Sequence, residues 1–160
     1  MSMKITKDDV SKVLASIQEL ASKQVLAGIP ASKAERDDDS PLNNAQLGYL
    51  QNYGSPAQNI PPREFMESGI ALVQDKIEGH LQKAAKAAVN GNSEKVDVEL
   101  NATGLVAQAG LRARINSGDF EELKKSTLAA RRRRGRTGVK PLIDKGELRN
   151  SLTYVIRKKD

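Results

Sequence analysis

The stretch SLTYVIR, residues 151–157, alternates apolar and polar side chains as a half-buried β-strand requires. Leu152, Tyr154 and Ile156 fall on one face of such a strand. Its backbone N–H and C=O groups need a partner strand, since they otherwise stay unpaired along an edge. The segment QVLAGIP, residues 24–30, is short, partly β-branched and ended by a proline, so we expect it to be that partner.

Apolar residues at helical spacing mark three further segments. The first covers residues 6–23, with Thr6 as the expected N-cap and Asp8 and Asp9 at the positive end of the helix dipole. Its apolar residues predict one buried stripe: Val10, Val13, Leu14, Ile17, Leu20 and Ala21. The longest pattern runs from Met66 to about residue 90 and predicts a single long helix.

A second long helix is predicted from about Ser93 to Ile115. Its expected buried stripe comprises Val98, Ala102, Leu105, Ala109 and Ala113. Gly104 and Gly110 each weaken this helix by about 1 kcal/mol relative to alanine, unless a close contact uses the missing side chain. Together, the segments predict an α+β fold in which a small mixed β-sheet packs against two long α-helices.

The 160 residues suit one domain, residues 1–160, in which the polar segments 31–43 and 131–140 are expected to be long mobile loops. Between them, residues 44–54 fit either a short helix, capped by Asn43 or Asn44 and ended by Gly54, or a strand. We favour a helical turn that runs into a strand. A capping box of Asp144 and Glu147 is expected to start a short helix before the final strand.

Composition argues against catalysis. The chain has no cysteine, which excludes disulfides, thiolate zinc sites and a cysteine nucleophile. His80 is the single histidine and has no nucleophile beside it in the sequence, so we expect a structural role for it. The acidic run Asp37–Asp39 lacks the spacing of a calcium loop and reads as a solvated segment. No phosphate-binding or dinucleotide-binding motif occurs, and we expect neither an enzyme nor a cofactor.

Charge is distributed unevenly along the chain. Residues 1–80 carry 8 basic and 11 acidic side chains, whereas residues 81–160 carry 18 and 9. The most basic stretch is ARRRRGR, residues 130–136, whose cations would contact DNA or an acidic partner: Arg131, Arg132, Arg133, Arg134 and Arg136. It has no interleaved aromatic residues to stack on bases, so any binding of nucleic acid is expected to be nonspecific. No apolar run is long enough to span a bilayer.

Two stretches carry a resemblance to a known family. The first is NNAQLGYLQNYGSPAQNIPPREF, with the pattern residues Gly48, Tyr49, Tyr53, Gly54, Ser55, Pro56, Ile60, Pro61, Arg63 and Phe65. The second is STLAARRRRGRTGVKPLIDKGELRNSLTYVI, with Thr127, Leu128, Arg131, Pro141, Leu142, Ile143, Asp144, Gly146, Leu148, Ser151 and Tyr154. Together they resemble the tail-completion or neck proteins of tailed bacteriophages, also called virion morphogenesis or minor tail proteins. The chain departs from the family pattern at Glu64, where proline is common, and at Lys145, where threonine is common.

The resemblance implies a structural role without catalysis. A protein of this kind joins the DNA-filled head to the tail in the virion neck and is assembled in the cytoplasm of the bacterial host. Its implied partners are copies of itself in a hexameric or dodecameric ring, portal or adaptor proteins, and tail-tube or terminator proteins. The residues expected at assembly interfaces are Tyr49, Tyr53, Pro61, Arg63, Phe65, Leu142, Asp144, Leu148 and Tyr154. A tail-tube terminator ring and a basic nucleic-acid-binding module are the alternative functions.

Overall fold

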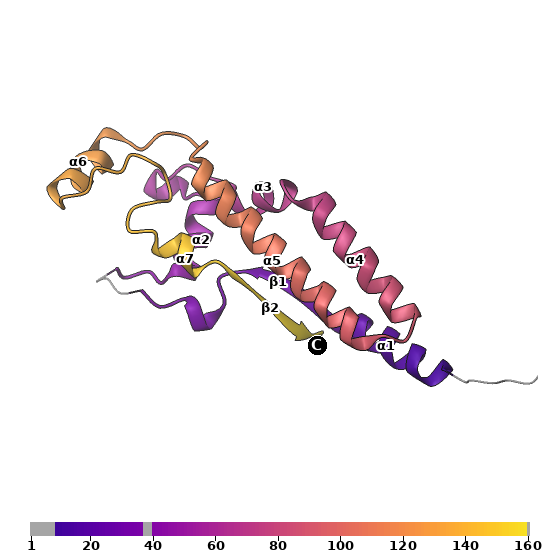
Figure 1. The fold of residues 1–160 in the computed structure, drawn as a ribbon. Coiled ribbons are helices and arrows are strands. Elements are labelled where there is room, and N and C mark those ends of the chain that lie inside the picture. The colour runs from indigo at the N-terminus through magenta and orange to yellow at the C-terminus, as the bar shows by residue number, and fades with distance from the viewer. Residues whose placement is uncertain (1–8, 37–39, 160) are drawn as a thin grey trace, which may run out of the picture.

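The computed structural model describes residues 9–36 and 40–159, and Figure 1 shows an elongated α+β arrangement built along one helix. Helices and strands follow in this order: α1 (Val10–Ser22), β1 (Lys23–Gly28), α2 (Asn44–Tyr53), α3 (Phe65–Ala71), α4 (Gln74–Val89), α5 (Ser93–Ser117), α6 (Lys125–Arg133), α7 (Glu147–Ser151) and β2 (Thr153–Lys158). Short 3₁₀ turns occur at Ala31–Lys33 and Pro56–Gln58. No helix in the described ranges is both long and apolar enough to cross a membrane.

Helix α5 is the central element, and its bounds agree with the predicted helix. The Asn92 side chain caps it by accepting from the backbone N–H of Lys95 at 2.9 Å, and Gly118 ends it in the left-handed conformation. Helix α4 packs along its N-terminal part, while α3 crosses nearer its C-terminal part (Figure 1). One core cluster lies on each part: Ala87, Ala88, Val96 and Leu100 near the start of α5, and Phe65, Leu111, Ile115 and Leu152 near its end.

The predicted pairing of the two strands is confirmed. Strand β1 runs antiparallel to β2, with Val25 opposite Ile156 and Ala27 opposite Tyr154. The inner face of this sheet packs on α5, where Leu152 is completely buried. The sheet is not mixed, however, because residues 9–36 and 40–159 supply only these two strands.

The single long helix expected from Met66 onward is wrong, because the chain turns at Leu72 and Val73 between α3 and α4. Helix α3 approaches α5 closely: a Cβ atom on Gly110 would lie 2.5 Å from the backbone oxygen of Gly69. The alanines of helix α4 instead pack against the N-terminal end of α5. A change of direction between the two helices lets both of them pack on α5.

The stripe expected on α5 is also wrong. Val98 and Leu105 are 59% and 56% exposed, so the expected stripe lies largely on the solvent side. The buried face instead comprises Val96, Leu100, Thr103, Gly104, Ala107, Gly110, Leu111 and Ile115. Glycine adds little to a hydrophobic pattern, yet here Gly104 lets the Tyr154 ring approach the helix and Gly110 lets the backbone of α3 approach it.

Helix α1 does not bury the stripe expected for it. Its one fully buried side chain is Ser16, whose hydroxyl lies 2.8 Å from that of Ser93 at the start of α5. Val10, Leu14 and Ile17 are 62%, 54% and 41% exposed. A small polar residue sits on the packed side because the helix approaches the turn between α4 and α5 closely. The expected Thr6 cap and Asp8 lie outside the described residues, and Asp9 makes no side-chain cap hydrogen bond.

Residues 44–53 form one continuous helix, so the expected passage into a strand is wrong. The cause is a complete capping box: the Asn43 side chain accepts from the N–H of Gln46, and the Gln46 side chain accepts from the N–H of Asn43. The capping box predicted at Asp144 and Glu147 is absent. Gly146, with φ of 87°, occupies the N-cap of α7 without a side-chain cap, because Asp144 is engaged by arginines instead.

Of the two expected loops, 31–43 contains a 3₁₀ turn, and the run Asp37–Asp39 lies outside the described residues. In the other, residues 131–133 belong to helix α6. Mobility of the remaining parts stays a prediction.

Candidate partner-binding cavity and surfaces

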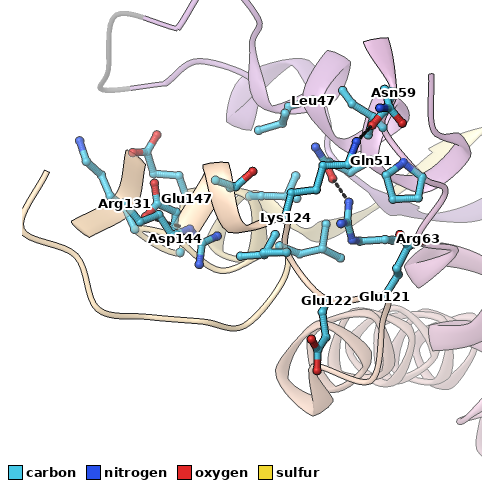
Figure 2. A pocket seen from close by; sticks show the side chains of 18 of the residues that line it. Leu47, Gln51, Asn59, Arg63, Glu121, Glu122, Lys124, Arg131, Asp144 and Glu147 are labelled. Atoms are coloured by element: carbon cyan, nitrogen blue, oxygen red, sulfur yellow. Dashed lines mark hydrogen bonds and ion pairs between the residues drawn. The ribbon is translucent and has the colours of Figure 1, made fainter. Parts of the chain in front are cut away.

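The two stretches that carry the family resemblance meet around one cavity of about 340 Å³ (Figure 2). The first stretch contributes Leu47, Gln51, Asn59, Ile60, Pro61 and Arg63, and the second contributes Thr127, Arg131, Leu142, Asp144, Lys145, Gly146, Glu147 and Leu148. Arg36 and residues 121–124 complete the lining. Segments that are far apart in the sequence therefore build one site.

A tight turn brings Pro61 and Arg63 to this cavity. Gly54 starts the turn with φ of 75°, and a Cβ atom there would lie 2.8 Å from the carbonyl oxygen of Ile60. Ser55 and Ile60 then pair through two backbone hydrogen bonds of 2.9 and 3.0 Å. Only glycine combines this conformation with so close an approach, so Gly54 fixes where the following prolines lead the chain.

Gln51 of α2 holds Arg63 through two hydrogen bonds. Its backbone oxygen accepts from the Arg63 N–H at 2.9 Å, and its Oε1 accepts from a guanidinium nitrogen, also at 2.9 Å (Figure 2). Arg63 is only 7% exposed, and its Nε has no hydrogen-bond partner in the described part of the chain. Burial lowers the pKa of this guanidinium, and the more distant Glu121 carboxylate opposes that shift. The positive charge is therefore buried, with the Glu121 carboxylate acting on it from a distance but with no ion pair among the described residues.

Asn52, the next residue on α2, joins α2 to α3. It is fully buried; its Oδ1 accepts from the N–H of Met66 at 3.0 Å, and its Nδ2 donates to Glu67 at 2.8 Å. Glu67 also accepts from the Tyr53 hydroxyl at 2.9 Å. The hydrogen bond from Asn52 is the main cause that lowers the pKa of Glu67, and the Glu67 carboxylate raises the pKa of Tyr53.

The arginine-rich stretch divides into internal and external residues. Arg131 is 6% exposed and donates to the carbonyl oxygens of Gly138 and Lys140 at 2.8 and 3.1 Å. Asp144 lies 3.7 Å from Arg131 and also accepts from Arg136. These contacts hold the loop that follows α6. The side chains of Arg132, Arg133 and Arg134 are exposed at the end of α6, the element that projects from one end of the molecule in Figure 1.

Other expected interface residues fall into three environments. Phe65 and Leu148 are 0% and 4% exposed; Phe65 belongs to the interior of the chain, and Leu148 also lines the cavity. Tyr154 packs over Gly104 and donates to Asn101 at 3.1 Å. Tyr49 and Tyr53 are 67% and 53% exposed, with ring centroids 4.8 Å apart, and we call this pair the tyrosine surface.

The sequence did not predict a second exposed apolar surface. It consists of Val10, Leu14 and Ile17 on α1, and we call it the α1 surface. Helix α1 lies near the N-terminal end of α5, and the tyrosine surface lies on α2, near the C-terminal end of α5 (Figure 1). The helical spacing on α1 revealed these apolar residues but not that they stay uncovered. His80, in turn, bridges α4 to α5 through Glu99 at 2.7 Å, the kind of structural contact expected for it.

Comparisons with protein-family models, curated proteins and solved structures found no match. Function is therefore a proposal that rests on the residues and their geometry.

Proposed function

We propose that this protein is a structural subunit of the neck of a tailed bacteriophage, where a ring of copies joins the DNA-filled head to the tail. The observation that supports this role is that, among residues 9–36 and 40–159, two different apolar surfaces are exposed near opposite ends of α5. A ring needs heterologous contacts, in which one patch of a subunit meets a different patch of the next. The α1 surface and the tyrosine surface supply two such patches.

The two-stranded sheet supports the same role. Within the described ranges, β1 and β2 each pair on one side only, so each has a free backbone edge. Leu26 and Val155, which face each other on the outer side of the sheet, are 38% and 37% exposed. An extended segment of a neighbour can add to such an edge through backbone hydrogen bonds.

The family resemblance suggests that the protein assembles in the neck of the virion. Its two stretches come together at one cavity, as expected if the pattern encodes a shared site. On this proposal the protein acts in the virion, in a hexameric or dodecameric ring between portal or adaptor proteins and tail-tube or terminator proteins. The exposed Arg132, Arg133 and Arg134 would face an acidic neighbour or the DNA passage.

Electron microscopy of particles made without the protein tests this role. Tail-less heads beside free tails of normal length support the joining role. Tails of uncontrolled length support the alternative of a tail-tube terminator ring. Normal infectious particles would refute both.

The exposed arginines of α6 favour one alternative of another class, a module that binds nucleic acid nonspecifically. Binding of the purified protein to duplex DNA, measured over a range of salt concentrations, tests it. A steep loss of affinity with salt that becomes shallower when Arg132, Arg133 and Arg134 are replaced by serine supports phosphate contacts. Absence of binding at low salt would refute this alternative.

A further inference from the structure

The cavity combines apolar walls with one buried cation. Its aliphatic lining consists of Leu47, Ile60, Pro61, Leu123, Leu142 and Leu148. Arg63 lies among these side chains, and Figure 2 shows its guanidinium turned toward Gln51. The volume of about 340 Å³ falls within the range of ~300–1,000 Å³ that is usual for ligand pockets.

Arg63 differs from the other cations of the lining. Arg131 lies 3.7 Å from Asp144, and Arg36 lies 3.4 Å from Glu147, so both have carboxylate partners. Lys124 is exposed and donates to the carbonyl oxygen of Asn59 at 2.7 Å. Arg63 is buried, donates only to the neutral side chain of Gln51, and forms no ion pair with any described residue.

A guanidinium offers five N–H donors, and a buried one is stabilised when a carboxylate accepts from two of them. The single side-chain hydrogen bond of Arg63 leaves its buried Nε without a partner among the described residues. Removing a charge from water without a counter-ion is unfavourable, so an arriving anion would gain a charge-assisted interaction at this point.

The surrounding charges limit what that anion can be. Asp144 and Glu147 are paired with arginines, but the exposed Glu121 and Glu122 also line the cavity, and their carboxylates would repel a polyanion such as DNA or RNA. The aliphatic walls favour a ligand with an apolar body. A single carboxylate beside an aliphatic side chain satisfies both conditions.

We propose that this cavity binds a segment of a partner polypeptide that carries a carboxylate next to an aliphatic side chain, with the carboxylate on Arg63. This deepens the proposed assembly role by naming the chemistry of one partner. It does not depend on ring formation, because ligand binding and subunit association have separate readouts.

The test uses two small probes and the full chain labelled with ¹⁵N. N-acetyl-leucine presents the carboxylate and the aliphatic group, whereas N-acetyl-leucinamide lacks the charge. We expect saturable NMR shifts at the amides of Gln51, Leu142 and Leu148 with the acid, and binding at least about tenfold weaker with the amide, as a charge-assisted hydrogen bond implies. Equal binding of the two probes, or no saturable shift with the acid, would overturn the proposal.

Two variants test whether the carboxylate of N-acetyl-leucine binds to Arg63. Gln51→Glu puts a carboxylate where Oε1 now accepts from Arg63, so we expect a higher melting temperature and at least about tenfold weaker binding of N-acetyl-leucine. Arg63→Gln should abolish the preference for the acid over the amide. Because loss of Arg63 can also disturb folding, Gln51→Glu is the decisive variant.

The matched control is Lys125→Gln, which removes an exposed cation that does not line the cavity and should change binding less than about twofold. Unchanged binding of the acid by Gln51→Glu would overturn the proposal. A variant that no longer binds N-acetyl-leucine but still forms rings would refute the cavity proposal and leave the assembly role intact. A protein that binds N-acetyl-leucine but forms no rings would refute the ring and leave the cavity proposal intact.

Discussion

The ring of Tyr154 in β2 lies against Gly104 in α5 so closely that a Cβ atom at position 104 would be 2.1 Å from a ring carbon. No side chain fits between them. The sheet thus packs on α5 where the helix has no side chain, and the Tyr154 hydroxyl completes the contact by donating to Asn101 at 3.1 Å.

Gly104→Ala should lower the free energy of unfolding by about 1–2 kcal/mol, because overpacking at the Tyr154 ring outweighs the gain in helix propensity. Gly79→Ala in α4 is the matched control. Nothing lies within 4 Å of a Cβ atom at Gly79, so this change should stabilise the chain by roughly 0.5–1 kcal/mol. Urea unfolding of both variants measures the difference, and stabilisation by Gly104→Ala would contradict the close contact.

Leu14→Glu should dissociate the proposed ring without unfolding the subunit. Leu14 is 54% exposed in the single chain, so the free energy of unfolding should change by less than about 0.5 kcal/mol. A charge placed in an apolar interface is unfavourable, and native mass spectrometry should therefore show monomers. Gln18→Glu on the same helix adds the same charge at an exposed polar site and should leave the ring intact. Equal behaviour of the two variants would argue against the α1 surface as an interface.

Glu67 should make stability depend on pH at both extremes. Its pKa is lowered in the folded chain, so its contribution is present above the ordinary value of 4.5 and is lost as pH falls through the folded value. The pKa of Tyr53 is raised, so the contribution of its hydroxyl is present below 10.0 and is lost as pH rises through the folded value.

Glu67→Gln should flatten both limbs of the profile of unfolding free energy against pH. Glu64→Gln removes the same charge from a nearby side chain that, among the described residues, makes no hydrogen bond to Asn52 or Tyr53, and it serves as the control. An unchanged profile in Glu67→Gln would show that the hydrogen bond between Tyr53 and Glu67 does not stabilise the contact of α2 with α3.

Arg131→Ser and the triple change of Arg132, Arg133 and Arg134 to serine should affect different properties. Arg131 joins α6 to residues 138–144, so its loss should lower the free energy of unfolding by about 2 kcal/mol. The three exposed arginines support no such contacts across the loop, and their loss should leave the melting temperature unchanged while reducing particle assembly. Normal assembly by the triple variant would remove the proposed contact with DNA or an acidic neighbour.

The sequence predicted the elements whose patterns are strong and local. The alternation in residues 151–157 predicted β2 and its inward face, and the spacing after Ser93 predicted α5. The sequence did not predict correctly which face of a helix is buried or where the chain changes direction. Hydrophobic spacing predicted that Val98 and Leu105 are buried. The packed face of α5 instead contains glycines, which let Tyr154 and α3 approach the helix closely.

The cavity could be predicted only in part. The family pattern named Pro61, Arg63, Leu142, Asp144 and Leu148 as residues of assembly sites, and the structure brings all five to the cavity. It could not show that Arg63 would be buried without an anion, since that depends on Gln51 from another helix. Nor did it separate Phe65, which is core, from residues that reach the cavity.

The pairing of residues 23–28 with residues 153–158 also governs when the polypeptide can fold on the ribosome. Strand β1 is synthesised before β2, and residues 29–152 must follow it before β2 can join it. Loop closure over so many residues slows folding and leaves the β1 backbone open to wrong partners meanwhile. We therefore expect nascent chains that lack β2 to depend on chaperones.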